Sequence, residues 1–252
     1  MKKILSMLLV LCMALTLCSA AFAESKSPVD GMTVAFIPKV SGNSFFEAAN
    51  DGAQKYAADW GLTFDYIGAP TADVTTQLEL IQQAIDKGVD AICISSVDAT
   101  GLDEKLQEAQ DAGIFVSTWD SDVSPDARAL MISQGTADVL GPMLVDMAVD
   151  SLTERGVDVN GEVKYVWHFS NPSVSDQNSW YVAGDAYIKE KYPTWVAVND
   201  PYYSNQDPAQ SVSVGESILD AYPDIDVIIC NDSTALPGQC KAAENKGLTA
   251  KD

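Results

Sequence analysis

The sequence predicts an α/β protein built from two doubly wound, Rossmann-like lobes with a ligand cleft between them. Short runs rich in β-branched and aromatic residues alternate with amphipathic segments of helical length, which is typical of βαβ units and parallel sheets. The run at 91–95 has no polar alternation until its end, as expected for a parallel strand covered on both faces. Five such runs precede a longer helix at 139–153 and three follow it, so this helix is expected to cross between the lobes.

The first lobe is predicted to span residues 24–136. Ser44 is a candidate N-cap for its first helix. Apolar residues recur at helical spacing from Val74 to Ile85, and Gly88 is a typical C-terminal stop for that helix. We expect strands at 33–37, 62–67, 91–95, 114–118 and 129–132, and helices at 44–60, 73–87 and 102–112.

The second lobe is predicted to span residues 137–252 and to be incomplete. The expected strands are 163–169, 195–198 and 227–230, and the expected helices after the crossing segment are 176–191, 209–221 and 235–246. A further strand should follow the last helix in such a sheet, but the sequence stops at Asp252. We therefore expect the chain to be a fragment whose second sheet leaves strand edges unpaired, and so to be unstable or prone to aggregate.

Residues 1–23 are predicted to be a secretory signal peptide. Lys2 and Lys3 precede a mostly apolar run at 4–17, and Ala21-Phe22-Ala23 offers a cleavage site with small residues. The run is shorter than the ~20 apolar residues that span a bilayer as a helix. A membrane anchor and a lipid anchor on Cys18 remain alternatives. The signal predicts an extracytoplasmic protein in the periplasm or cell envelope.

The composition excludes several classes of function. The 252 residues carry 36 acidic and 15 basic side chains, for a net charge of −21. Removal of residues 1–23 takes away two lysines and no acid, which leaves −23. Such a surface repels nucleic acid, and the 47% hydrophobic content argues against disorder. Of the three cysteines beyond the signal, Cys93 and Cys230 lie in apolar runs and are expected to be buried free thiols.

Polar residues gather directly after the predicted strands, where ligands bind in parallel α/β sheets. Carboxylates accept hydrogen bonds from hydroxyl groups, amides and lysine donate them, and aromatic faces cover the C–H surface of a sugar ring. This combination favours a small, neutral, polyhydroxylated ligand. The predicted ligand-binding residues are Lys39, Phe45, Phe46, Trp119, Asp120, Asp176, Gln177, Asn231, Asp232 and Ser233.

Other interpretations compete at several of these positions. Asp176 could only cap a helix, and Asp122, close to Asp120, is more typical of a structural residue. A sugar-processing enzyme using Asp120 and Asp176 is a further alternative. However, the one histidine, His168, lies in an apolar strand as a satisfied core or rim residue would, and common nucleophile, zinc and phosphate motifs are absent. We therefore expect no enzyme activity, no cofactor and no metal.

These residues also carry a family resemblance, which runs from about Val34 to Asn245. The chain resembles the type I periplasmic solute-binding proteins of ABC importers, and within them the autoinducer-2 receptor (LsrB) family, near the rhamnose- and ribose-binding proteins. The stretches that carry it are Ala35–Lys39 with Phe45-Phe46, Thr118–Asp122, Gln134–Thr136, Met143–Ala148, Val174–Asn178 with Trp180, Ala235–Pro237 and Ala242–Asn245.

The resemblance implies two lobes on a three-segment hinge that close on autoinducer-2 or a related furanose, with rhamnose or a pentose as the alternative ligand. It implies an ABC permease in the membrane as partner, and we expect a monomer. The family's ligand residues carry over onto Lys39, Asp120, Asp176 and Gln177. After the strand at 227–230 the family has Pro-Asp-Ala, whereas this chain has Asn231-Asp232-Ser233, and the added polar groups could refit the site to a related sugar.

Overall fold

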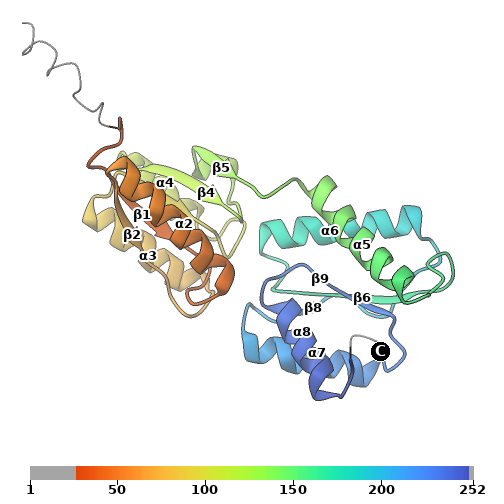
Figure 1. Cartoon of the computed structure of the whole chain (residues 1–252). Helices are drawn as coiled ribbons and strands as arrows, with labels where there is room; N and C mark the ends of the chain where they lie inside the picture. The colour runs from red at the N-terminus through yellow and green to blue at the C-terminus, as the bar shows by residue number, and fades with distance from the viewer. Residues whose placement is uncertain (1–26, 250–252) are drawn as a thin grey trace, which may run out of the picture.

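The computed structural model describes residues 27–249, which form two lobes, each built on a parallel sheet (Figure 1). The predicted signal peptide at 1–23 lies outside the described residues. The connection between the last strand of the first sheet, β5, and helix α5 runs from one lobe to the other (Figure 1). Within residues 27–249, no helix combines the length and apolar character needed to cross a membrane.

The first lobe holds a five-stranded sheet in the order β2-β1-β3-β4-β5, with all neighbouring strands parallel. Each crossover returns the chain to the same edge, so the carboxyl ends of the strands share one side of the lobe. The elements are β1 (Thr33–Ile37), α2 (Ser44–Trp60), β2 (Thr63–Tyr66), α3 (Val74–Lys87), β3 (Ala91–Ile94), α4 (Asp103–Asp111), β4 (Phe115–Trp119), η2 (Pro125–Ala127) and β5 (Leu130–Ile132).

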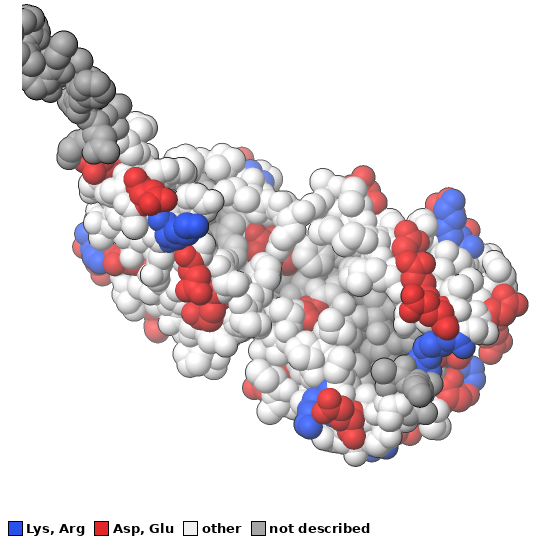
Figure 2. All heavy atoms as spheres, viewed as in Figure 1, with Lys and Arg blue, Asp and Glu red and all other residues white. Residues whose placement is uncertain are grey.

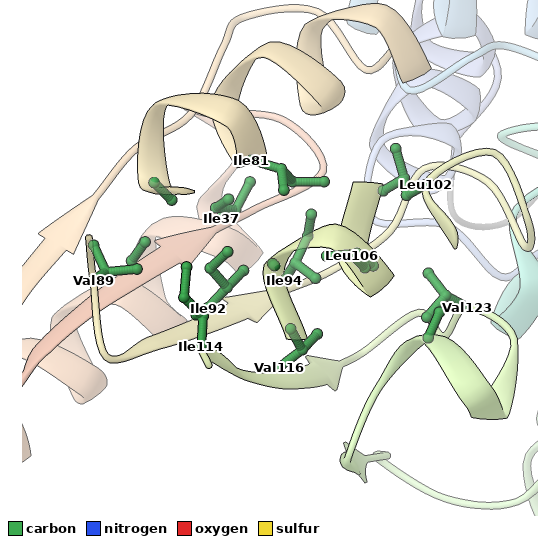
Figure 3. Close-up of a cluster of buried hydrophobic side chains, with 14 residues drawn as sticks. Ile37, Ile81, Val89, Ile92, Ile94, Leu102, Leu106, Ile114, Val116 and Val123 are labelled. Carbon is green, nitrogen blue, oxygen red and sulfur yellow. The ribbon is translucent and has the colours of Figure 1, made fainter. Parts of the chain in front are cut away.

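The first core lies between the sheet and helices α3 and α4. Ile37 of β1, Ile81 of α3 and Leu106 of α4 are among its fully buried members (Figure 3). Because successive strand residues point to opposite faces, the neighbour Phe36 lies on the other side, where its ring stacks on Trp119 at 4.6 Å. Helix α2 packs on that side through Phe46, whose ring meets Trp119 edge-on.

The second lobe centres on β6, which has a partner strand on each side. Strands β7 and β8 pair with its two ends along one edge, and β9 pairs along the other, all in parallel. Helices α5 and α6 cover one face, and α7 and α8 the other (Figure 1). The elements are α5 (Ala137–Glu154), β6 (Lys164–Phe169), α6 (Ser175–Lys191), β7 (Val196–Ala197), β8 (Tyr202–Tyr203), α7 (Pro208–Ala221), β9 (Val227–Cys230) and α8 (Ala235–Asn245).

The second core is rich in aromatic side chains, because alternate residues of β6 send Tyr165, Trp167 and Phe169 towards α5 and α6. These two helices approach closely at glycine. A Cβ on Gly141 of α5 would lie 2.6 Å from the backbone nitrogen of Gly184 in α6. Helices α5 and α6 can therefore pack this closely only because residue 141 has no side chain.

The predicted elements agree with the structure except in a few local features. Helix α2 is capped by Asn43, whose side chain accepts from the Phe45 amide, and the expectation that Ser44 is the cap was wrong. The two-residue strand β8 was not predicted, so four strands, not three, follow α5 among the described residues. Gly88 does end α3, in the left-handed conformation.

Candidate functional site

The cleft between the lobes contains a cavity of about 370 Å³ that gathers nearly all the predicted ligand residues. It is bordered by residues that follow β1, β4, β5, β6, β8 and β9, which brings the strand ends of both sheets to one place. Nine of the ten predicted residues line it, namely Lys39, Phe45, Phe46, Asp120, Asp176, Gln177, Asn231, Asp232 and Ser233. Figure 2 shows acidic side chains spread over the visible face of both lobes around this junction.

Lys39 lies at the centre of the charged part of the cavity. Its side chain is 1% exposed, and Nζ lies 2.9 Å from Oδ2 of Asp120 and 3.3 Å from Oδ1 of Asp176. Burial alone would lower the pKa of Lys39, but the carboxylates of Asp176 and Asp120 outweigh burial and raise that pKa. Lys39 is therefore a buried ammonium that joins a carboxylate of each lobe.

Asp120 is held by donors from its own lobe. Its carboxylate accepts from the Ser95 hydroxyl at 2.7 Å and from the Gln134 amide, in addition to Lys39. Its backbone has φ of +61°, a conformation uncommon for a residue with a side chain. Strain of this kind persists where surrounding contacts fix the residue, and it clusters at binding sites.

Asp176 lies in the first turn of α6 and faces the first lobe. Its Oδ1 accepts from the Ser121 hydroxyl as well as from Lys39. Burial raises the pKa of Asp176, against the opposing attraction of Lys39. Val174, not Asp176, is the N-cap residue of α6, so the helix-cap interpretation does not account for this carboxylate.

The amide and acid groups of the second lobe form a connected network along one wall of the cavity. Gln177 accepts from the Ser170 backbone amide and donates to Asp232 at 2.8 Å. The other oxygen of Asp232 accepts from the backbone amides of Thr234 and Ala235 at the start of α8. Gln177 and Asp232 are thus both held by protein groups, and they orient this wall of the cavity.

Asn231 differs from these two residues. Its Nδ2 donates to the Gln177 carbonyl at 2.8 Å, but its Oδ1 is buried with no hydrogen-bond partner among the described residues. A buried acceptor without a partner is costly unless a ligand supplies the donor. Asn231 is therefore suited to accept a ligand hydroxyl.

The aromatic residues form a stack of which only part reaches the cavity. The Phe45 and Phe46 rings lie edge to face at 5.1 Å and both line the cavity. Trp119 was predicted to contact the ligand, but it is not among the lining residues. It lies behind them, because its ring is sandwiched between Phe36 and the phenylalanines of α2.

Several other predictions are decided by the structure. Asp122 is structural, since both of its oxygens accept from the Arg128 guanidinium. His168 is buried in the core as expected, with the Gln239 side chain beside its ring. Burial lowers the pKa of His168. Cys93 and Cys230 are free thiols but only partly buried, and burial raises the pKa of both.

The structure adds cavity residues that the sequence analysis did not propose. Gln134 follows β5, so the rule that ligand groups follow strands could have found it. Trp180, which belongs to the stretches that carry the family resemblance, lines the cavity from α6. Gln206 follows β8, a strand too short for its pattern to be recognised. The apolar part of the lining comes from Leu140, Met143, Leu144, Cys230 and Leu236.

The two lobes also touch at residues other than Lys39. Asn43 Nδ2 donates to the hydroxyls of Ser233 at 3.2 Å and Thr234 at 3.1 Å. Ser175 of the second lobe bonds both the backbone amide and the carbonyl of Asp122 in the first. A second cavity of about 540 Å³, here called the mouth cavity, lies between the residues around Asn43 and those around Gln206.

A family model for the periplasmic binding protein domain matches residues 34–252. The chain belongs to this family. The matched residues include both lobes and every predicted ligand residue.

Among solved structures, the chain is similar to LsrB from Clostridium saccharobutylicum in complex with AI-2. The two are 59% identical with a TM-score of 0.86, over 87% of this chain and 68% of that one. A solute-binding protein from Burkholderia graminis in complex with D-arabinose is 27% identical, with a TM-score of 0.74, over 86% of this chain and 71% of that one.

Among curated proteins, the chain is similar to the D-ribose/D-allose-binding protein of Pseudomonas aeruginosa, at 29% identity over 50% of this chain. The match spans 41% of that relative's length, and the match to a xylose/arabinose-binding protein of Sulfolobus acidocaldarius spans 23%. The chain thus spans less than half the length of the first curated relatives it matches.

Proposed function

We propose that this chain is the extracytoplasmic ligand-binding component of an ABC importer, and that it binds autoinducer-2 or a closely related furanose between its lobes. The observation that carries the proposal is the buried Lys39, which joins Asp120 of one lobe to Asp176 of the other at the cavity wall. The 59% identity to a receptor solved with AI-2 supports the ligand class.

The same geometry supplies a mechanism. A furanose entering the cavity would donate ring hydroxyls to Asp120 and Asp176 and accept from Lys39, while Phe45 and Phe46 exclude water. Because the ligand contacts both lobes, binding favours the closed arrangement of the hinge over an open one. Closure would then present both lobes to a membrane permease.

A pentose or rhamnose is the second candidate ligand, and the residues after β9 favour it. Asn231 and Ser233 are polar where the family resemblance implies apolar neighbours of Asp232, and both line the cavity. An enzyme acting on a sugar is disfavoured, since the two carboxylates are bridged by a lysine instead of being free for acid–base work.

The site is tested by ligand-induced thermal stabilisation of the Asp120→Asn and Asp176→Asn variants. Each change leaves a ligand hydroxyl or Lys39 without its carboxylate, which costs about 1–3 kcal/mol or more. We expect AI-2 to raise the melting temperature of the parent chain and of Asp51→Asn, an exposed control in α2, but not of the two site variants. Equal stabilisation of all four proteins would refute the site.

We further propose that residues 1–23 direct export and that the mature protein is a monomer. The supporting features are the two lysines, the apolar run and the Ala21-Phe22-Ala23 site. N-terminal sequencing of the secreted or envelope fraction should begin at Glu24, and light scattering should give the mass of one chain. An N-terminus at Met1 would contradict the export proposal, and a dimer mass would contradict the monomer.

A further inference from the structure

Gln206 connects the ligand cavity to the mouth cavity. It is one of two residues that line both, and the other, Ser233, is exposed. Gln206 is only 5% exposed, and its Oε1 is buried with no hydrogen-bond partner among the described residues. Buried amide oxygens in folded proteins are nearly always paired, so this one needs a specific explanation.

The backbone around Gln206 fixes the direction of its side chain. Asn205 and Gln206 both have positive φ, at +50° and +56°, which non-glycine residues rarely adopt. The turn is tied down by the Asn205 amide, which donates to the Ser170 carbonyl, and by the Asp207 amide, which donates to the Ser204 carbonyl. Strain held in this way by neighbouring contacts is characteristic of binding sites.

Gln206 lies in the second lobe, as does Asn231, the other cavity residue with an unpaired buried amide oxygen. The carboxylate acceptors of the cavity, Asp120 and Asp176, already receive protein donors. Two acceptors on the second-lobe wall are therefore unmatched, and one of them faces the boundary with the mouth cavity.

We propose that Gln206 is a specificity-determining residue that accepts a hydrogen bond from a ligand hydroxyl directed towards the mouth cavity. The ligand class is then a furanose with a further hydroxyl on that side of the ring, in addition to the hydroxyls held by Asp120 and Asp176. This inference rests on the proposed function and names a contact that the function itself does not require.

A purely structural role for Gln206 makes a different prediction. A side chain that stabilises its loop should lower the melting temperature when it is made apolar. A side chain with an unpaired buried oxygen should leave the melting temperature unchanged or raise it, because an apolar group of similar shape removes the unmet acceptor. Gln206→Met keeps the length of the side chain and separates the two roles.

The experiment compares the parent chain, Gln206→Met and the control Gln210→Met by calorimetric titration and by thermal unfolding without ligand. Gln210 is exposed and lines only the mouth cavity. The titrants are AI-2, D-ribose, D-arabinose and L-rhamnose. For the titrant that the parent binds, we expect Gln206→Met to weaken affinity about tenfold or more without a lower melting temperature, and Gln210→Met to change neither.

Every outcome is informative. If the parent binds one titrant and Gln206→Met binds it equally tightly, this inference fails while the proposed function stands. A lower melting temperature or loss of folding in Gln206→Met would show that the side chain supports the loop, and would also overturn the inference. If the parent binds none of the four titrants, the proposed function and this inference fail together.

Discussion

The two lobes share an architecture but differ in how they build the cleft wall and the core behind it. The buried cluster between the first sheet and helices α3 and α4 contains only alanine, valine, leucine and isoleucine, whereas the buried cluster of the second lobe includes Tyr165, Trp167, Phe169 and Trp195. In the first-lobe wall, Asp120 is held by donors of its own lobe. In the second, Asp176 takes donors from the first lobe, and Asn231 keeps an unmatched acceptor.

This difference indicates that the two lobes contribute different features to the cleft. The first lobe presents a prearranged charge network, and the second presents a wall whose hydrogen bonds are completed by the first lobe and, under the proposed function, by the ligand. Because the second-lobe wall takes hydrogen bonds from the first lobe, it gains more hydrogen bonds than the first-lobe wall when the lobes close. The following predictions test that comparison.

The largest effect is expected for Lys39→Met, which removes the cation shared by the two walls. Breaking a buried ion pair from one side leaves uncompensated carboxylate charge and costs about 3–5 kcal/mol. We expect loss of AI-2 binding in titrations and a lower melting temperature. Lys164→Met, which removes an exposed pair with Asp224, should change neither. Unaltered binding by Lys39→Met would mean that the lysine does not join the walls.

The next largest effect concerns the packing of the second lobe. Ala at Gly141 would place a methyl group against the backbone of α6, so Gly141→Ala should destabilise the protein by about 1–3 kcal/mol or more in chemical denaturation. Gly52 lies inside α2 of the first lobe, and nothing lies within 4 Å of its added Cβ. Gly52→Ala should therefore stabilise by about 0.5–1 kcal/mol. Equal changes in the free energy of unfolding for Gly141→Ala and Gly52→Ala would contradict the proposed difference in packing between the lobes.

A pH effect should distinguish the second-lobe carboxylate. Because burial raises the pKa of Asp176, its ionised acceptor form is lost on acidification at a pH above the ordinary value of 3.8. AI-2 affinity should fall as pH drops through this raised pKa. The stability contribution of Asp176 in the unliganded protein has the opposite sign, since it is present at low pH and is lost as pH rises past 3.8 through the raised pKa.

Titrations of AI-2 across the acid range would check the binding part of this prediction. Asp176→Asn should bind weakly with a flatter pH profile, because the group that titrates is gone. An affinity of the parent chain that stays constant as the pH falls to the ordinary value of 3.8 would contradict an ionised Asp176 with a raised pKa as ligand acceptor.

The smallest effect is expected at Phe45, which lines the cavity but is 39% exposed. Phe45→Ala should reduce AI-2 affinity by about 1 kcal/mol through lost ring contact, with little change in stability. Tyr56→Ala, at an exposed aromatic position farther along α2, should leave affinity unchanged. If Phe45→Ala lost as much affinity as Lys39→Met, the aromatic ring and not the charged lysine would be the main contributor to binding.

Much of this organisation could be predicted from the sequence, because the carboxyl ends of parallel strands all lie at the same edge of a sheet. Lys39, Asp120 and Asp176 follow clear apolar runs, so the fold rule alone brings them to one cleft. Asn43 and Ser44 are adjacent residues that can both cap a helix, and pattern alone does not choose between them.

The remaining features depend on three-dimensional detail. Gln206 was not predicted, because strand β8 has only two residues and therefore shows no alternation of polar and apolar residues. The direction of the Gln206 side chain also depends on the positive φ angles of Asn205 and Gln206, which the sequence pattern does not show. Trp119 follows the same strand-end rule as Asp120, yet its ring turns back onto Phe36. A rule about strand ends predicts where a residue lies, but side-chain packing decides what it faces.

The central claim is that the cavity joining the two lobes binds a furanose of the autoinducer-2 class. Its most direct test is a calorimetric titration of the exported chain with AI-2 alongside D-ribose, D-arabinose and L-rhamnose. The account predicts saturable binding of AI-2 with one site per chain and weaker or no binding of the three sugars. No heat of binding with AI-2, while one of the sugars saturates the site, would contradict the ligand, and no binding by any of the four would contradict the claim itself.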